Sequence, residues 1–268
     1  MTPPASVLRA LGLLLASKTL LVALPLLVLR ADSGHGTISA LAAVGLVGIA
    51  RGRAWGSAAL LCAFALRVVL TFPHTLNHAW FELLVALVLW RAATRPDPGT
   101  TAHAHRVLVL ALLSVFFYSG VQKIAHGQFT TGEYLLRALV LESGGMTDAL
   151  RGLLAPWGPL PSGHANELLL RPVELHVAPA LVVGLRLLSI GTIVAEIGLP
   201  VLVALGVKGS RWALLAAQIG IGLVSSEIDF ALTATGMVLL LWGQPPRAAW
   251  IVAFAGWVVV GAILWTPG

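Results

Sequence analysis

The chain has 268 residues, of which 58% are hydrophobic and only 10% are charged. A typical soluble domain is about 25% charged, so this composition excludes a water-soluble domain and predicts a polytopic membrane protein. The formal net charge of +6 is compatible with nucleic acid or with anionic lipid. The basic residues are distributed among loops and form no cluster, so we expect lipid headgroups as the partner and no nucleic acid.

Apolar stretches that reach or approach the length of a membrane span, about 17–25 residues, recur along the chain. These stretches are 7–29, 37–50, 57–72, 78–92, 107–125, 185–207, 212–226, 230–242 and 248–265. The second, seventh and eighth are short, so each is either a tilted span or a re-entrant segment. The expected fold is an all-α, polytopic membrane helix bundle with about nine transmembrane helices, in a single domain 1–268.

The first stretch is too long for the apolar core of a signal peptide, and we interpret it as a retained helix. It contains Lys18, and a lysine in the middle of a span needs a carboxylate or water. Glu196 is one candidate partner. Cys62 is the single cysteine, which excludes an intramolecular disulfide and a cysteine-based zinc site.

Basic residues fall in alternate connections between these stretches, and short cytoplasmic loops are enriched in Lys and Arg. This pattern predicts a cytoplasmic N-terminus and an extracytoplasmic C-terminus. A long extracytoplasmic segment, 126–184, then separates the fifth and sixth helices. Leucines at helical spacing near its start predict an amphipathic helix on the membrane interface. The segment either caps a cavity among the helices or rests on lipid as a linker.

Several polar side chains lie within or near the apolar stretches, where each needs a partner. Glu82 either forms an ion pair with Arg67 or forms a hydrogen bond with His78 one turn earlier. The Arg67 pair is at least as consistent with helix packing as with catalysis. His74 and His78 are four residues apart, but two histidines without a third ligand are weak evidence for a metal, and we expect none.

Lys123 and His126 lie at the end of the fifth apolar stretch. An ionisable group at membrane depth is a candidate functional site. A lysine near a helix end also has a simpler explanation, because its long side chain reaches the interface at little cost. Position alone favours this simpler explanation slightly.

Three segments add information about Lys123, namely Tyr118-Ser-Gly-Val-Gln-Lys-Ile, Leu76-Asn-His-Ala-Trp-Phe-Glu and Glu196-Ile-Gly-Leu-Pro. In order and composition they resemble segments of the HTTM (horizontally transferred transmembrane) family, which includes the vitamin K-dependent γ-carboxylases. The resemblance implies that Lys123 is the base that starts quinol oxygenation and that His78 supports it. It also implies reduced menaquinone or vitamin K as cofactor, bound as a quinone-type lipid near the extracytoplasmic face.

Further polar residues are candidates to line the substrate or cofactor pocket of such a site. They are Asn77, Tyr118, Gln122, His126, Glu82, Arg67, Glu196, Glu227 and Asp229.

The sequence also departs from the γ-carboxylases. Gln122 stands where those enzymes have a second lysine, and no histidine follows His176. The chain also ends at Gly268, without their large peptide-binding domain. These departures count against glutamate carboxylation but leave quinol chemistry as an expectation. The alternative class is a non-catalytic helix bundle that binds a lipid, a quinone, a peptide or a partner membrane protein.

Overall fold

The computed structural model describes residues 5–30, 33–72, 77–125, 127, 129–136, 156, 178–224 and 228–264. Every regular element in these residues is a helix, which confirms the all-α prediction. The chain divides into two compact units. The first comprises Met1–Leu112 with Asp229–Ile251, and the second comprises Leu113–Ile228 with Val252–Gly268. A helix bundle can contain more than one compact unit, so the single domain 1–268 stays a prediction.

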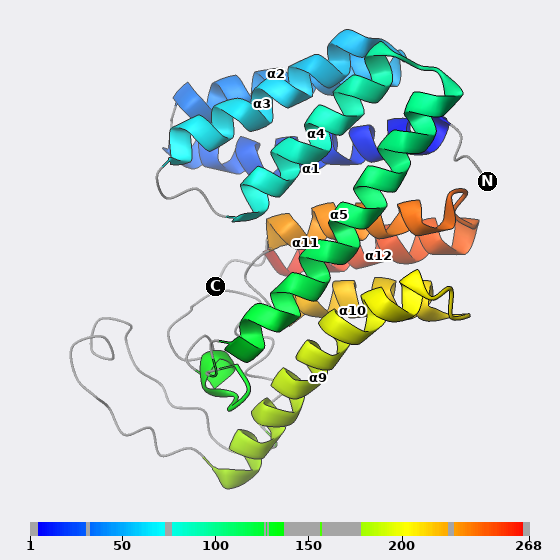
Figure 1. Ribbon diagram of the computed structural model, residues 1–268. Helices are drawn as coiled ribbons and strands as arrows, with labels where there is room; N and C mark the ends of the chain where they lie inside the picture. The colour runs from blue at the N-terminus through cyan, green and yellow to red at the C-terminus, as the bar shows by residue number, and fades with distance from the viewer. Residues whose placement is uncertain are drawn as a thin grey trace. The chain divides into compact units, whose positions relative to one another are not determined.

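The first unit contains four consecutive helices and a return segment from late in the chain (Figure 1). The consecutive helices are α1 (Ala5–Arg30), α2 (Ser33–Ala50), α3 (Ala54–Thr71) and α4 (Asn77–Thr94). The return segment is α11 (Ile228–Val238), which continues as the 3-10 helix η2 (Leu239–Trp242). Residues 231–241 of this segment are all buried. A helix that is apolar and buried all round needs neighbours on every side, and the segment therefore belongs to the core of this unit.

Helices α2 and α3 cross with their backbones in contact, and Figure 1 shows them side by side. A Cβ atom added to Gly48 would lie 2.5 Å from the Cα atom of Gly56, and one added to Gly56 would overlap the backbone of Ile49. Gly52, at φ +68°, makes the tight turn between the two helices. Small residues of this kind let helices approach closely where the apolar effect alone does not select a neighbour.

The second unit is built on α9 (Pro179–Ala204) and α10 (Ser210–Val224), together with the last part of α5 (Pro98–Ala125) and most of α12 (Arg247–Leu264). The chain that follows α5 turns back onto α9. Phe129 and Leu135 are buried there against Leu181, Leu185 and Ile193. The predicted interfacial helix is described only as far as residue 136, and its Leu135 packs on protein.

Gly132 makes this return possible, because its φ of +80° is a conformation that other residues rarely adopt. A Cβ atom at this position would lie 2.8 Å from the backbone nitrogen of Arg186. The segment after α5 therefore touches the backbone of α9 directly.

Helix α5 begins with a capped turn outside its apolar part. The Asp97 carboxylate accepts hydrogen bonds from the Thr100 backbone N–H (2.8 Å) and hydroxyl (2.6 Å), and Pro98 follows it as the first helical residue. This is a standard N-cap arrangement. The hydrogen bonds from Thr100 hold the pKa of Asp97 below its ordinary value.

Within the described residues, helix occupies most of each of the nine apolar stretches expected from the sequence, whereas nine transmembrane helices stay a prediction. Within the described residues, three helices are long and apolar enough to cross a membrane: α3, α5 and α9. With 28 and 26 residues, α5 and α9 are about 42 and 39 Å long, which exceeds a hydrocarbon core of about 30 Å. The segments Gly34–Ala50, Ala231–Trp242 and Arg247–Val258 are shorter apolar helices.

We expect Gly56→Ala to destabilise the protein by about 1–3 kcal/mol, because the added methyl group forces α2 and α3 apart. The matched control is Gly220→Ala in α10, where an added Cβ atom meets nothing within 4 Å. That change should be neutral or stabilising by up to about 1 kcal/mol, because alanine is the better helix former. Thermal unfolding in detergent measures both changes, and equal stabilities of the two variants would contradict the close crossing.

Candidate functional site

The strongest feature of the second unit is an ion pair between Lys123 of α5 and Glu196 of α9. The Lys123 Nζ atom contacts both carboxylate oxygens of Glu196 and lies 2.6 Å from Oε2. The Lys123 side chain is 23% exposed, and that of Glu196 is 4% exposed. A buried carboxylate is costly without a partner, so this pair compensates both charges.

Two further groups hold the Lys123 ammonium in place. It donates a hydrogen bond of 2.9 Å to the Ser119 hydroxyl, one helical turn earlier. It also lies 5.1 Å from the centre of the Phe129 ring, within the range of a cation–π contact. The side chain therefore turns toward α9 and Phe129 and is only partly open to its surroundings.

Gly120 allows α5 and α9 to come close enough for this pair to form. A Cβ atom at position 120 would lie 2.6 Å from Ile197 Cγ1 and 3.2 Å from the Cβ atom of Glu196. Any larger residue would push α9 outward at the level of Glu196. The glycine of the Tyr-Ser-Gly-Val-Gln-Lys segment is therefore a positioning residue for the ion pair.

Pro200 lies one turn after Glu196, and α9 continues as helix through it to Ala204. Because proline has no N–H, it removes the helical hydrogen bond to the carbonyl of Glu196. The turn that carries the buried carboxylate therefore has a weakened backbone ladder. A proline inside a helix commonly kinks it, and we expect such a kink at Pro200.

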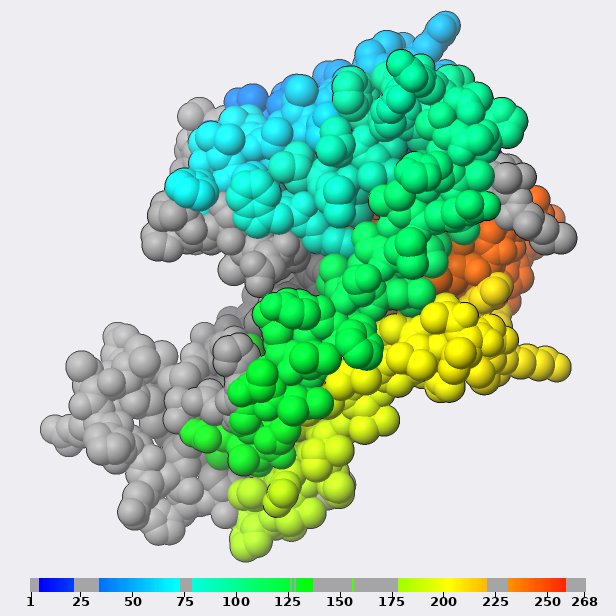
Figure 2. All heavy atoms as spheres, viewed as in Figure 1, coloured from blue at the N-terminus to red at the C-terminus, as the bar shows by residue number. Residues whose placement is uncertain are grey.

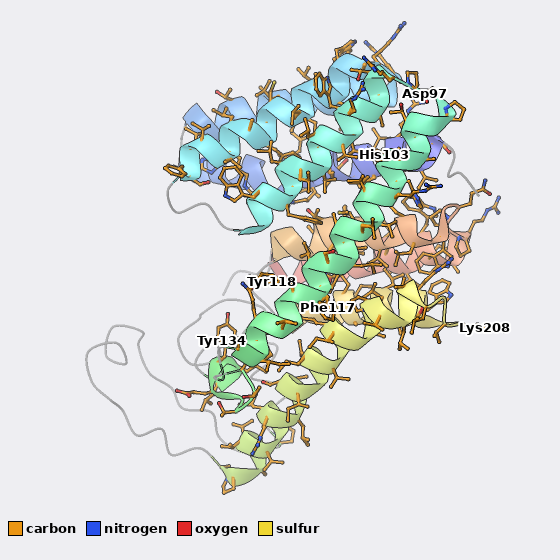
Figure 3. The ribbon with its side chains drawn as sticks, viewed as in Figure 1. Asp97, His103, Phe117, Tyr118, Tyr134 and Lys208 are labelled. Atoms are coloured by element: carbon orange, nitrogen blue, oxygen red, sulfur yellow. The ribbon has the colours of Figure 1, made fainter. Side chains whose placement is uncertain are left out.

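Two of the other predicted site residues of the second unit, Tyr118 and Gln122, are described, and neither joins this pair. Tyr118 is 61% exposed and, in the view of Figure 3, projects from the side of α5 that faces away from α9. Gln122 lies one turn after Tyr118 and is half-buried. His126 and Glu227 lie outside the described residues.

A second polar cluster lies in the first unit, where one carboxylate meets two cations. Lys18 of α1 forms an ion pair with Oε1 of Glu82 in α4. Arg67 of α3 bonds to Oε2 of the same carboxylate at 2.9 Å. The Thr233 hydroxyl of α11 accepts a bond of 2.9 Å from Lys18 and lies 2.7 Å from Glu82 Oε1, to which it donates. Four helices therefore meet at one carboxylate.

The members of this cluster differ in how deeply they are buried. The side chains of Lys18 and Glu82 are 0% exposed, whereas that of Arg67 is 23% exposed. Figure 2 shows closely packed side chains of α3 and α4 on one face of this unit. Lys18 also lies 5.9 Å from the centre of the Phe64 ring. The cluster is thus enclosed by protein at Lys18 and reaches the surface at Arg67.

The predicted Arg67–Glu82 ion pair is confirmed, but the suggested partner of Lys18 was wrong. Lys18 pairs with Glu82, and Glu196 pairs with Lys123. The physical reason is helix neighbourhood, because α1 packs beside α4 in the first unit while α9 lies beside the end of α5 in the second. Thr233 was missed, since a threonine in an apolar stretch carries no sequence signal of a charged partner.

His78 and Asn77 lie in the first turn of α4, and Asp229 lies in the first turn of α11. Their side chains are outside the described ones. His78 belongs to the first unit and Lys123 to the second, so their predicted convergence on one cavity stays a prediction. Among the described residues, no three His, Cys, Asp or Glu side chains are arranged to hold a metal ion.

Comparison with known proteins gives no family, since no family model, no curated protein and no solved structure matches this chain. Its function is therefore inferred from the two clusters and from the local resemblance of the three sequence segments.

We expect Glu82→Gln to destabilise the protein by about 3–5 kcal/mol, because it leaves Lys18 and Arg67 facing a neutral amide in a buried place. Lys18→Met should cost less, since Glu82 keeps its bonds to Arg67 and Thr233. Unfolding of the two purified variants in detergent tests this order. A Lys18→Met protein less stable than Glu82→Gln would show that Arg67 does not compensate the carboxylate.

Proposed function

We propose that the chain is a multi-pass membrane protein that carries out quinol chemistry at the Lys123–Glu196 pair, as the resemblance to the γ-carboxylases implies. One observation supports this proposal above the others. Lys123 and Glu196 come from two of the three resembling segments, 73 residues apart in the chain, and their side chains are in contact. Contact between these two segments is what a common site requires.

The groups around the pair suit the ring of a reduced naphthoquinone. Its hydroxyl needs a hydrogen-bonding partner and a base, and its ring needs apolar or aromatic neighbours. Lys123 and Glu196 provide the hydrogen-bonding groups, and Phe129 beside them provides the aromatic neighbour. When bound and deprotonated, a reduced naphthoquinone reacts with oxygen and supplies the strong base that the γ-carboxylases use on carbon.

The proton steps of the chain itself follow from the ion pair. A lysine in contact with a carboxylate is an ammonium, and it accepts a proton only after it has given one away. Glu196 is the group that can receive this proton, since its Oε2 lies 2.6 Å from Nζ. The N–H bond breaks, an O–H bond forms on Glu196, and a neutral amine remains as the base. Ser119 then keeps the amine aimed at one position. The supporting role of His78 is carried by the resemblance alone.

A second candidate function is a non-catalytic bundle that binds a lipid or a partner membrane protein. The observation that favours it is the pairing of both lysines, Lys18 with Glu82 and Lys123 with Glu196. Ion pairs of this kind also serve to select helix neighbours in an apolar protein. The two candidates differ in whether Lys123 changes its protonation state.

We expect Lys123→Arg to abolish quinol-dependent epoxide formation, because a guanidinium keeps the ion pair but cannot act as a base. The assay incubates protein in nanodiscs with reduced menaquinone or vitamin K and oxygen, and follows the epoxide. Lys208→Arg, in the exposed turn after α9 (Figure 3), is the matched control and should retain activity.

Two results would contradict the proposed chemistry. Equal turnover by wild type and Lys123→Arg would exclude the base role of Lys123. No turnover by folded wild type across several quinols would favour the non-catalytic bundle.

The topology also belongs to the proposal, with a cytoplasmic N-terminus and Lys123 near the extracytoplasmic face. It is tested with single cysteines at Arg95 and Gly145, introduced after the exposed Cys62 has been replaced by serine. An impermeant maleimide should label position 145 from outside intact cells and position 95 only after lysis. Labelling of both positions from the same side would overturn the predicted orientation.

A further inference from the structure

The proton steps proposed at Lys123 use no residue of the cluster around Glu82, and this cluster contains a lysine whose side chain is fully buried. Lys18 and Glu82 are 0% exposed, and Thr233 is 1% exposed. A lysine and a carboxylate are costly to bury even as a pair, and a pair of apolar residues is often as stable in such a place. In membrane proteins, ionisable residues within spans commonly mark paths for ions or protons. We propose that Lys18, Thr233 and Glu82 form a proton-binding site within the first unit.

Because the side chains of Lys18 and Glu82 are fully enclosed, only a very small ligand can bind to them. A binding site for a lipid, a quinone or an anion needs an accessible face, and the side chains of Lys18 and Glu82 present none. A proton needs only a chain of hydrogen bonds. Lys18 contacts Glu82 Oε1 directly, and the Thr233 hydroxyl adds a second connection, because it accepts from Lys18 Nζ at 2.9 Å and donates to Glu82 Oε1 at 2.7 Å.

Because Arg67 also pairs with Glu82, the carboxylate does not depend on the positive charge of Lys18 alone. A guanidinium remains charged at any accessible pH, and Arg67 holds Oε2 of Glu82 at 2.9 Å. When Lys18 loses its proton, the carboxylate therefore still has a charged partner. The summed charge of Lys18, Arg67 and Glu82 falls from +1 to 0 as one N–H bond of Lys18 breaks. The proton first forms an O–H bond on Glu82, which Lys18 contacts directly, and this bond breaks when water at the exposed side of Arg67 accepts the proton. Lys18 stays bonded to Thr233 as a neutral amine.

The neighbouring helices place other titratable residues one turn from the cluster. His78 lies four residues before Glu82 on α4, and Asp229 lies four residues before Thr233 on α11. Residues four apart share a helix face. On α2 the described stretch 37–50 has no ionisable residue, and His35 lies in its first turn. Among the described members of the cluster, the enclosed pair meets the surface at Arg67, whose side chain is 23% exposed.

A pH jump applied to proteoliposomes on a solid-supported membrane tests this site, because a proton that enters the membrane interior produces a transient charge displacement. We expect a displacement from wild type and its loss in Lys18→Met. Lys208→Met is the matched control and should keep the displacement, since the turn that carries Lys208 is exposed. The measurement needs no quinol, so its outcome is independent of the proposed chemistry at Lys123.

Thr233→Val provides a second test that preserves all the charges and nearly the same shape. Its displacement should be reduced or slowed, because Lys18 and Glu82 each lose the hydrogen bond to Thr233 while their direct contact remains, whereas a purely structural ion pair would give no displacement to reduce. Thermal unfolding in detergent verifies that each variant is folded. The proposal is overturned if wild type gives no displacement, or if a folded Lys18→Met or Thr233→Val protein matches wild type.

Discussion

The energetic cost of an unpaired charge in an apolar interior is the constraint on which this structure depends. In a protein that is 58% hydrophobic, the apolar effect does not choose one helix neighbour over another, because lipid tails are as apolar as leucine. Ion pairs do choose, since each buried charge is stable only beside its partner. Glu82 joins α1, α3, α4 and α11 in this way, and so fixes a late segment of the chain among the first four helices.

Glycine provides the short distances that these polar contacts require. The Lys123–Glu196 pair forms because Gly120 has no side chain, so α5 and α9 approach each other more closely than a Cβ atom at position 120 would allow. Gly48 and Gly56 do the same for α2 and α3 at a crossing lined by apolar neighbours. Close approach and charge pairing are therefore separate devices, and the site at Lys123 uses both.

The positions of the helices could be read from the sequence because long apolar runs separated by polar turns leave little choice. It was harder to predict which charged residues pair with each other. Arg67 and Glu82 were paired correctly because α3 and α4 follow each other through a short connection, which makes their adjoining ends neighbours. Lys18 lies 64 residues from Glu82, and the sequence offered Glu196 as an equally charged alternative. The packing of α1 beside α4 decides between Glu82 and Glu196 as the partner of Lys18. That packing depends on how side chains fit together along the whole length of both helices.

The two lysines differ in the one property that decides what each can bind. Both are paired with a carboxylate, and both meet an aromatic ring and a hydroxyl, so composition alone would give them the same role. Lys123 is 23% exposed at the end of its helix, whereas Lys18 is fully enclosed in the middle of one. The Lys123 side chain is therefore partly accessible from outside, whereas the Lys18 side chain has no exposed surface. Exposure is therefore the property that separates the two proposals, quinol chemistry at Lys123 and proton binding at Lys18.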